Sequence, residues 1–271
     1  MPHRPNLNYL YDGSFEGLLC CVFESYQRDE IPADILPPDS SQLSFLPGRE
    51  IGTDPERARR VLRSIPEKMG QDALGLVKYA FLTCLAQKEL HILLFLRRGY
   101  QCGPSICRRL TDDAVYPVQK AVQHLTREAH LLKGFIRFSA YGNLLAAEIG
   151  PENFVLPLLT EHFCRRFPEE RFLIHDTAHE MALLYCPHKA AILGTEGLTM
   201  PLPDREEQDF RELWRTYYNT IEVPGRHNPK CRMSHMPKRY WAYMTELGRE
   251  EKETGRLSAP TSAAFSLEEK R

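Results

Sequence analysis

The feature that most constrains the fold is a change of hydrophobic period near residue 134. Upstream of it, apolar residues recur every three or four positions, as in the run from Val115 to Leu132, which is typical of amphipathic helices. Downstream of it, apolar and polar residues alternate on both sides of Gly142-Asn143, a favourable two-residue hairpin turn. The sequence therefore predicts helices first and strands afterwards.

From this order we expect an α+β fold with a helical N-terminal half, a small antiparallel sheet in the middle, and C-terminal helices that pack back. A polar C-terminal end with Ser, Ala, Pro and Glu predicts a disordered tail. The expected parts are a single domain over 9–248, made of a helical part 9–133, a sheet-containing part 134–200 and C-terminal helices with a basic loop over 204–248, followed by the tail 249–271.

Three further segments complete this outline. Four prolines and several serines between Ile31 and Thr53 predict a loop or partly ordered linker. Asn153 is placed to cap the helix that carries Leu156 and Leu159. Short strands are expected to extend the same antiparallel sheet at Phe172–His175, Glu180–Tyr185 and Lys189–Leu193.

Composition limits the classes of function. The 271-residue chain has a formal net charge of −1, so any contact with a polyanion must be local. No apolar run reaches about 18 residues, and Met1–Asn8 has no apolar signal core. We therefore expect a cytoplasmic protein with no membrane partner. Eight irregularly spaced cysteines without a C-x-x-C pair indicate reduced thiols that bind no iron–sulfur cluster.

The segment 224–241 is strongly basic. No acidic residue occurs between Glu222 and Glu246, and the segment ends in Tyr240-Trp241. Such a run of cations repels itself unless an anion lies nearby, and cations beside aromatic rings suit a nucleic-acid backbone with exposed bases. The alternative is a solvated positive surface above an ordinary buried aromatic stripe.

In the nucleic-acid interpretation each side chain has an expected role. Asn228 shapes the loop or touches a base, and Tyr240 or Trp241 stacks on a base. A helix begins at Pro237, whose N-terminus adds to the attraction for anions. The residues expected to bind phosphates are Arg226, Lys230, Lys238 and Arg239.

A turn near the N-terminus is a second candidate. Asp12 or Ser14 can cap the helix that follows, and Gly13 and Gly17 let the backbone come close to another surface. That surface is either another helix or the functional site.

Candidate acid–base residues are few. Glu128 and His130 lie two positions apart near the end of a long helix, so they do not share a face there. His162 follows on the next helix. A Glu/His pair could do general acid–base work near neutral pH; the alternative is a histidine favoured by the helix dipole, a solvated Glu128 and a core His162.

Several possible metal ligands occur between His175 and His188. On a helix, His175 and His179 would share a face. Their flanks read as strands, however, so residues 176–179 form a hairpin loop that separates the two imidazoles. We therefore expect no metal site in this region and predict none elsewhere.

Several stretches, taken together and in order, resemble a bacterial family of DNA metabolism proteins of unknown biochemical function. They are Tyr11–Gly17, Glu128-Ala129-His130, Gly134–Phe138, Leu156–Leu159 with His162-Phe163 and Arg166-Phe167, Arg226–Lys230 and Met236–Trp241. Members are typically encoded beside a radical-SAM protein related to DNA photoproduct lyases. In some lineages the domain is joined to a uracil-DNA glycosylase-like domain.

The resemblance implies an accessory protein that binds DNA and works in DNA repair or modification with a radical-SAM partner. The iron–sulfur cluster and S-adenosylmethionine are then expected only in the partner, and a uracil-DNA glycosylase-like protein is a second candidate partner. The chain departs from the family pattern at Arg232 and around His179, so the resemblance assigns no role to those side chains.

Two alternatives remain open. The first is a nucleic-acid-processing enzyme, glycosylase-like or nuclease-like, with a Glu/His site. The second is a protein-interaction scaffold whose basic loop binds an acidic surface. The sequence leaves open whether the chain has catalytic activity of its own.

Overall fold

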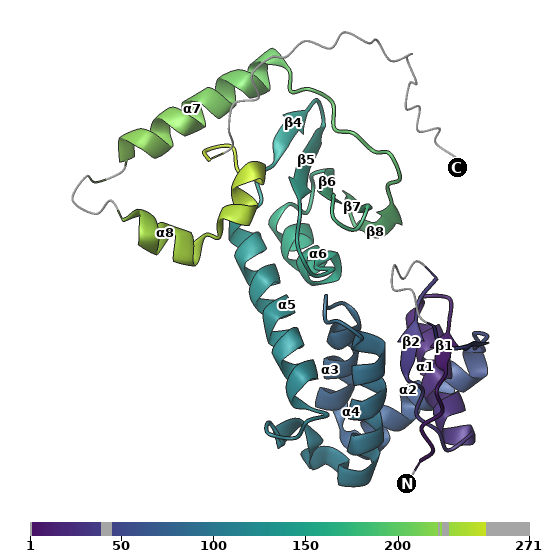
Figure 1. Ribbon diagram of the computed structural model, residues 1–271. Coiled ribbons are helices and arrows are strands. Elements are labelled where there is room, and N and C mark those ends of the chain that lie inside the picture. The colour runs from purple at the N-terminus through teal and green to yellow at the C-terminus, as the bar shows by residue number, and fades with distance from the viewer. Residues whose placement is uncertain (1, 39–44, 222, 224–227, 248–271) are drawn as a thin grey trace, which may run out of the picture.

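The computed structural model (Figure 1) describes residues 2–38, 45–221, 223 and 228–247. Mixed helices and strands follow the expected order, with helices first, a central sheet and helices after it. The α+β fold class is thereby confirmed. The helices are α1 (Phe15–Gln27), α2 (Pro55–Met69), α3 (Gln71–Phe81), α4 (Lys88–Cys102), η1 (Gly103–Arg108), α5 (Tyr116–Phe135), α6 (Leu156–Arg166), α7 (Arg205–Ile221), α8 (Pro229–His235) and η3 (Lys238–Tyr243).

The strands form two sheets. Strands β1 (Asn8–Leu10), β2 (Asp34–Leu36) and β3 (Gly48–Glu50) make a small parallel sheet in the order β2-β1-β3. Strands β4 (Ser139–Tyr141), β5 (Leu144–Ile149), β6 (Phe172–Asp176), β7 (Met181–Cys186) and β8 (Lys189–Gly194) make the central sheet in sequence order.

The parallel N-terminal sheet was not predicted. Strands β2 and β3 lie inside 31–53, which the sequence assigned to a loop or linker, and for these residues that prediction was wrong. Each strand has three residues, too few to show an alternating pattern. Residues 39–44 lie outside the described part of the chain.

The central sheet departs from the prediction at one pair. The hairpin at Gly142-Asn143 and the strands β6, β7 and β8 are where the sequence placed them. However, β5 and β6 run parallel, whereas an entirely antiparallel sheet was expected. Helix α6 lies between them and carries the chain back along the sheet, so that β6 starts at the same end as β5.

Helix α5 joins two hydrophobic clusters. Val118, near its start, and Val115, just before it, pack with α1–α4, whereas Leu125, Ala129 and Leu132 pack with α6 and the central sheet. Figure 1 shows α5 running from the N-terminal helices to the sheet. Because α5 takes part in both clusters, it holds the residues of its C-terminal half in a fixed position relative to the loops before α4 and α6.

The C-terminal elements differ in how they pack. Segment η3 returns to the core, where Tyr240 is buried. In contrast, Glu207 is the only residue of α7 that is buried among those described, and Figure 1 shows α7 crossing the end of the molecule beyond β4. The helix expected from Pro237 is a short 3₁₀ segment, preceded by α8. The predicted disordered tail, 249–271, lies outside the described residues. Within the described ranges, none of the helices has the length and apolarity required to cross a bilayer.

Candidate functional site

The centre of the candidate site is the buried carboxylate of Glu128 on α5. Its side chain is fully buried and accepts hydrogen bonds from four residues, of which Arg239 is described below. The backbone N–H groups of Glu152 and Asn153 donate to it at 3.1 and 2.9 Å, the Asn153 amide at 2.7 Å, and the Tyr240 hydroxyl at 2.9 Å. This carboxylate therefore ties α5 to the loop before α6 and to η3.

The charge state of Glu128 follows from these bonds. Burial raises the pKa of its carboxyl group, but the hydrogen bonds from Asn153, Glu152 and Tyr240 outweigh burial, and the net result is a lowered pKa. The carboxylate is thus ionised at neutral pH. The same environment raises the pKa of Tyr240 to about 12, chiefly through burial, so Tyr240 remains a hydrogen-bond donor.

Arg239 supplies the compensating positive charge. One guanidinium nitrogen lies 3.3 Å from the Glu128 carboxylate and 2.8 Å from the Tyr240 oxygen, while the other lies 2.5 Å from Oε1 of Glu152. We call Glu128, Asn153, Arg239 and Tyr240 the Glu128 hub. The Glu128 side chain is fully buried and the Arg239 side chain is 36% exposed, so loss of Arg239 would leave a buried carboxylate without its cation.

The hub changes two expected roles. The Tyr240 ring is 1% exposed and packs against Phe135, so it is not available to stack on a base. Arg239 makes internal ion pairs, which leaves little of its charge for a phosphate. Both residues hold η3 in place instead.

Two of the remaining basic side chains, Arg232 and Lys238, lie against the ring of Trp241. The guanidinium of Arg232 lies 5.4 Å from the centre of its ring and the ammonium of Lys238 lies 5.8 Å away. Lys230 and Lys238 are exposed, and Trp241 is partly exposed. We call Lys230, Arg232, Lys238 and Trp241 the α8–η3 face. Within the described residues, no ion pair engages any of its three cations.

Asn228 shapes this face. Its side chain accepts a hydrogen bond from the N–H of Cys231 at 3.0 Å and so caps α8. That role matches the expectation that Asn228 shapes the loop. Arg226 lies outside the described residues.

The Asp12–Gly17 turn is a structural cap. Ser14 caps α1 by accepting from Gly17 N–H, and Asp12 accepts from Ser14 and from the hydroxyl of Thr53. A Cβ at Gly17 would lie 2.2 Å from the Asp12 carboxylate, and Gly13 has a positive φ of 80°. The close approach that the glycines permit is thus made within the turn.

The loop between α3 and α4 links this turn to the hub. Phe15, just after the turn, packs edge-on against Phe81 at 5.3 Å. Three residues later, Cys84 N–H donates to the side-chain oxygen of Asn153 at 3.0 Å. The described contacts join the turn to the hub through this loop, and none joins the turn directly to the α8–η3 face.

The two candidate histidines lie apart from Glu128. His130 is exposed, two residues farther along α5. His162 is half-buried on α6 against Phe163 at 4.9 Å, and burial, Lys133 and Arg166 lower its pKa. The structure does not assemble the expected Glu/His pair.

The region around His175 forms the predicted hairpin. His175 lies on β6, whereas His179 follows the strand and pairs with the buried Asp176 at 2.8 Å. Nδ1 of His175 lies 3.5 Å from Glu148, so the two imidazoles lie against different carboxylates.

A different cluster of donor atoms was missed. Cys84, His124 and Glu152 place a sulfur, an imidazole nitrogen and a carboxylate oxygen within 4.8 Å of one another. These residues come from the α3–α4 loop, α5 and the loop before α6. Their spacings of 40 and 28 positions match no local motif, so no signal in the sequence pattern indicated them. Asn153, predicted to cap α6, lies beside this cluster and bonds to His124 and Glu128 instead.

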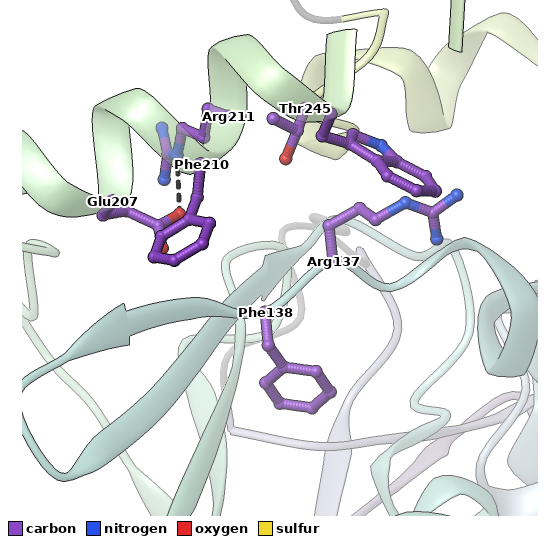
Figure 2. A pocket seen from close by; sticks show the side chains of 7 residues that line it. Arg137, Phe138, Glu207, Phe210, Arg211 and Thr245 are labelled. Atoms are coloured by element: carbon purple, nitrogen blue, oxygen red, sulfur yellow. Dashed lines mark hydrogen bonds and ion pairs between the residues drawn. The ribbon is translucent and has the colours of Figure 1, made fainter. Parts of the chain in front are cut away.

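A pocket of about 430 Å³ lies under α7. Figure 2 shows Phe210 and Arg211 of α7 on one side, with Arg137 and Phe138 opposite. The basic groups here are already paired, because Arg137 binds Glu246 at 2.6 Å and Arg211 binds Glu207 at 2.9 Å. The pocket therefore has a balanced charge and offers mainly aromatic surface.

Helix α7 also exposes an apolar stripe. Side chains spaced three or four positions apart are between 39% and 64% exposed, although Phe210 and Trp214 also line the pocket and the Trp214 indole N–H donates to Glu246. A contiguous apolar face of this size is typical of a protein interaction surface. The exposed residues are Phe210, Leu213, Trp214, Tyr217 and Ile221.

Comparison with known protein families matches residues 86–246 to a domain of unknown function, DUF4130. The match covers more than half of the 271 residues. The chain belongs to this family. The matched region contains the Glu128 hub and the α8–η3 face, whereas Cys84 and the Asp12–Gly17 turn precede it. A comparison with curated proteins gave no match.

Proposed function

We propose that this DUF4130 protein is a DNA-binding accessory protein that acts in DNA repair or modification with a radical-SAM enzyme. The observation that carries the proposal is the α8–η3 face, where Arg232 and Lys238 lie against Trp241 and Lys230 is exposed on α8. These cations are left without a described carboxylate partner, in contrast to Arg239.

The chemistry of this face suits a nucleic-acid strand with exposed bases. Lysine and arginine side chains bind phosphates and release counterions, and a partly exposed indole can stack on a base of any sequence. Arg239 and Tyr240 act as positioning residues, because their bonds to Glu128 hold η3, and with it Lys238 and Trp241, against the body of the protein.

The apolar stripe on α7 supports the part of the proposal that concerns a protein partner. Charged DNA does not cover an apolar helix face, whereas a second protein does. The radical-SAM enzyme is our proposed partner and would contribute the iron–sulfur cluster and S-adenosylmethionine. A uracil-DNA glycosylase-like protein is the second candidate for this surface.

The scaffold alternative is favoured by the same stripe, whereas the enzyme alternative has less support. Five donor groups engage Glu128, and neither His130 nor His162 supplies one of them. A carboxylate held in this way has no free lone pair directed at a substrate, which general acid–base catalysis requires.

Fluorescence anisotropy with labelled single- and double-stranded oligonucleotides tests DNA binding. We expect the Lys230→Ala/Lys238→Ala variant to lose about tenfold or more in affinity. The matched control is Lys78→Ala/Lys189→Ala, which removes two exposed lysines on α3 and β8. Equal affinities for the two double variants would contradict the proposed face.

Co-purification with the radical-SAM enzyme after nuclease treatment tests the partner. We expect Leu213→Asp, on the apolar stripe, to abolish the complex and to leave DNA affinity unchanged. If the complex is instead lost in the Lys230→Ala/Lys238→Ala variant and the protein binds no DNA, the scaffold function is correct and the DNA-binding function is wrong.

A further inference from the structure

Three side chains with zinc-type donor atoms meet beside the Glu128 hub. They are Cys84 after α3, His124 in the middle of α5 and Glu152 before α6, with ligand atoms within 4.8 Å of one another. Thiolate, imidazole and carboxylate are the three ligand types that proteins use for zinc. Three separate segments bring them together, so their proximity is a property of the fold.

The spacing of two of these atoms already suits a shared cation. Nε2 of His124 lies 3.4 Å from Oε2 of Glu152. Two ligands bound to one zinc ion at 2.0–2.2 Å in tetrahedral geometry are about 3.3–3.5 Å apart. Cys84 is exposed, so rotation about its single side-chain torsion can bring the sulfur into the same coordination sphere.

The surrounding hydrogen bonds hold two of the three residues, Cys84 and Glu152. The backbone N–H groups of Cys84 and Glu152 donate to Asn153 and Glu128 respectively. Arg239 occupies Oε1 of Glu152, which leaves Oε2 free to face His124. Such outer contacts orient metal ligands and are a large part of the affinity of known metal sites.

We propose that Cys84, His124 and Glu152 bind one divalent cation of the zinc class. The charges balance, because the thiolate and Glu152 compensate the dication while Glu128 compensates Arg239. Three protein ligands at an exposed site leave a fourth position for water, the arrangement of catalytic rather than structural zinc sites.

Binding also involves one proton shift and one proton loss. The Asn153 amide bonds to Glu128 and lies 3.1 Å from Nδ1 of His124, so in the free protein the imidazole proton sits on Nε2. The cation binds Nε2 of His124, and the imidazole proton moves to Nδ1. The hydrogen bond between Nδ1 and the Asn153 amide is then lost. The Cys84 thiol releases its proton to solvent as the thiolate forms.

Titration of the full, reduced chain with Co²⁺ and then Zn²⁺ tests the proposal. We expect one equivalent of Co²⁺ to bind with a thiolate-to-cobalt charge-transfer absorption, and Zn²⁺ to displace it. Cys84→Ser should abolish the absorption. His124→Gln and Glu152→Gln should each weaken Zn²⁺ binding at least tenfold in chelator competition, with circular dichroism showing that each variant is folded.

Cys231 offers the matched control. Its sulfur lies 3.7 Å from Nδ1 of His235 on α8, a Cys–His pair without a carboxylate, and Cys231→Ser should bind as tightly as the native chain. The proposal is overturned if the native chain binds no Co²⁺, or if the absorption survives Cys84→Ser and disappears in Cys231→Ser. These outcomes do not depend on DNA binding.

Discussion

The hydroxyl of Tyr240 donates to the buried carboxylate of Glu128 across 112 positions of sequence, at 2.9 Å. Together with Arg239 on the same carboxylate, this bond fastens the C-terminal segment to the long helix α5. The exposed cations and Trp241 of the α8–η3 face depend on that attachment for their position. The first three predictions below test the attachment, and the last two test the face.

Glu128→Gln should destabilise the fold by about 1–3 kcal/mol, because the amide NH₂ group faces the donors of Asn153 and Tyr240 and Arg239 keeps only Glu152 as an ion-pair partner. Urea unfolding at pH 7 measures the change in the free energy of unfolding. The control is Glu161→Gln, which removes an exposed carboxylate from α6 and should cost less than about 0.5 kcal/mol. Similar losses in both variants would show that the hub is not a stabilising element.

Stability should fall as the solution becomes acidic. The folded state lowers the pKa of Glu128 and of Glu246 below the reference value of 4.5. At a pH between the pKa of the folded state and the reference pKa of the unfolded chain, the unfolded chain binds more protons. The stabilisation from these two carboxylates is therefore complete above about pH 5 and is lost as the pH falls through the pKa of the folded state. Unfolding experiments from pH 7 to pH 3 should show a shallower decline for Glu128→Gln. If the free energy of unfolding of the variant fell with the same slope as that of the native chain, Glu128 would not contribute to the pH dependence of stability.

Gly150→Ala should weaken the packing of η3. A Cβ at this position would lie 2.3 Å from the hydroxyl of Tyr243, which itself contacts Thr177 at 3.1 Å. We expect a loss of about 1–2 kcal/mol from the resulting displacement. Gly134→Ala, in the last turn of α5 with nothing within 4 Å of the added carbon, should instead stabilise by about 0.5–1 kcal/mol. Thermal unfolding distinguishes the two directions.

Trp241→Ala should lower the affinity for single-stranded DNA about tenfold, since one stacked base contributes about 1–3 kcal/mol. Trp241→Phe should keep part of the affinity. Tyr116→Ala provides the comparison, because Tyr116 is 55% exposed at the start of α5 and lies on no proposed binding surface. An equal effect at both positions would argue against stacking on Trp241.

Local patterns predicted the local structure well. The alternation around Gly142-Asn143 and the short apolar runs from Phe172 to Leu193 identified five strands, because the period of a strand is visible within a few residues. The parallel pairing of β5 with β6 was not visible in the same patterns. It depends on which way α6 carries the chain, and an apolar run alone does not specify direction.

The basic segment shows that the charges nearby in sequence do not identify the ion-pair partners of a residue. The absence of acidic residues between positions 222 and 246 suggested that all its cations are free, but Arg239 pairs with Glu128 and Glu152, 111 and 87 positions away. Likewise the sequence left open whether Tyr240 stacks on a base or belongs to a buried aromatic stripe, and in the structure it is buried. The neighbours of a charge in space are set by packing, so the sequence identified the segment without distinguishing its structural cations from its exposed ones.

The dependence of DNA affinity on salt tests the central claim most directly. Each phosphate contact contributes a slope of about −0.7 to −0.9 in a plot of log affinity against log salt concentration. We predict that Lys230→Ala/Lys238→Ala reduces the steepness of the slope by about 1.4–1.8, and that Lys78→Ala/Lys189→Ala leaves it unchanged. Parallel lines for the native chain and the Lys230→Ala/Lys238→Ala variant would contradict a phosphate-binding α8–η3 face.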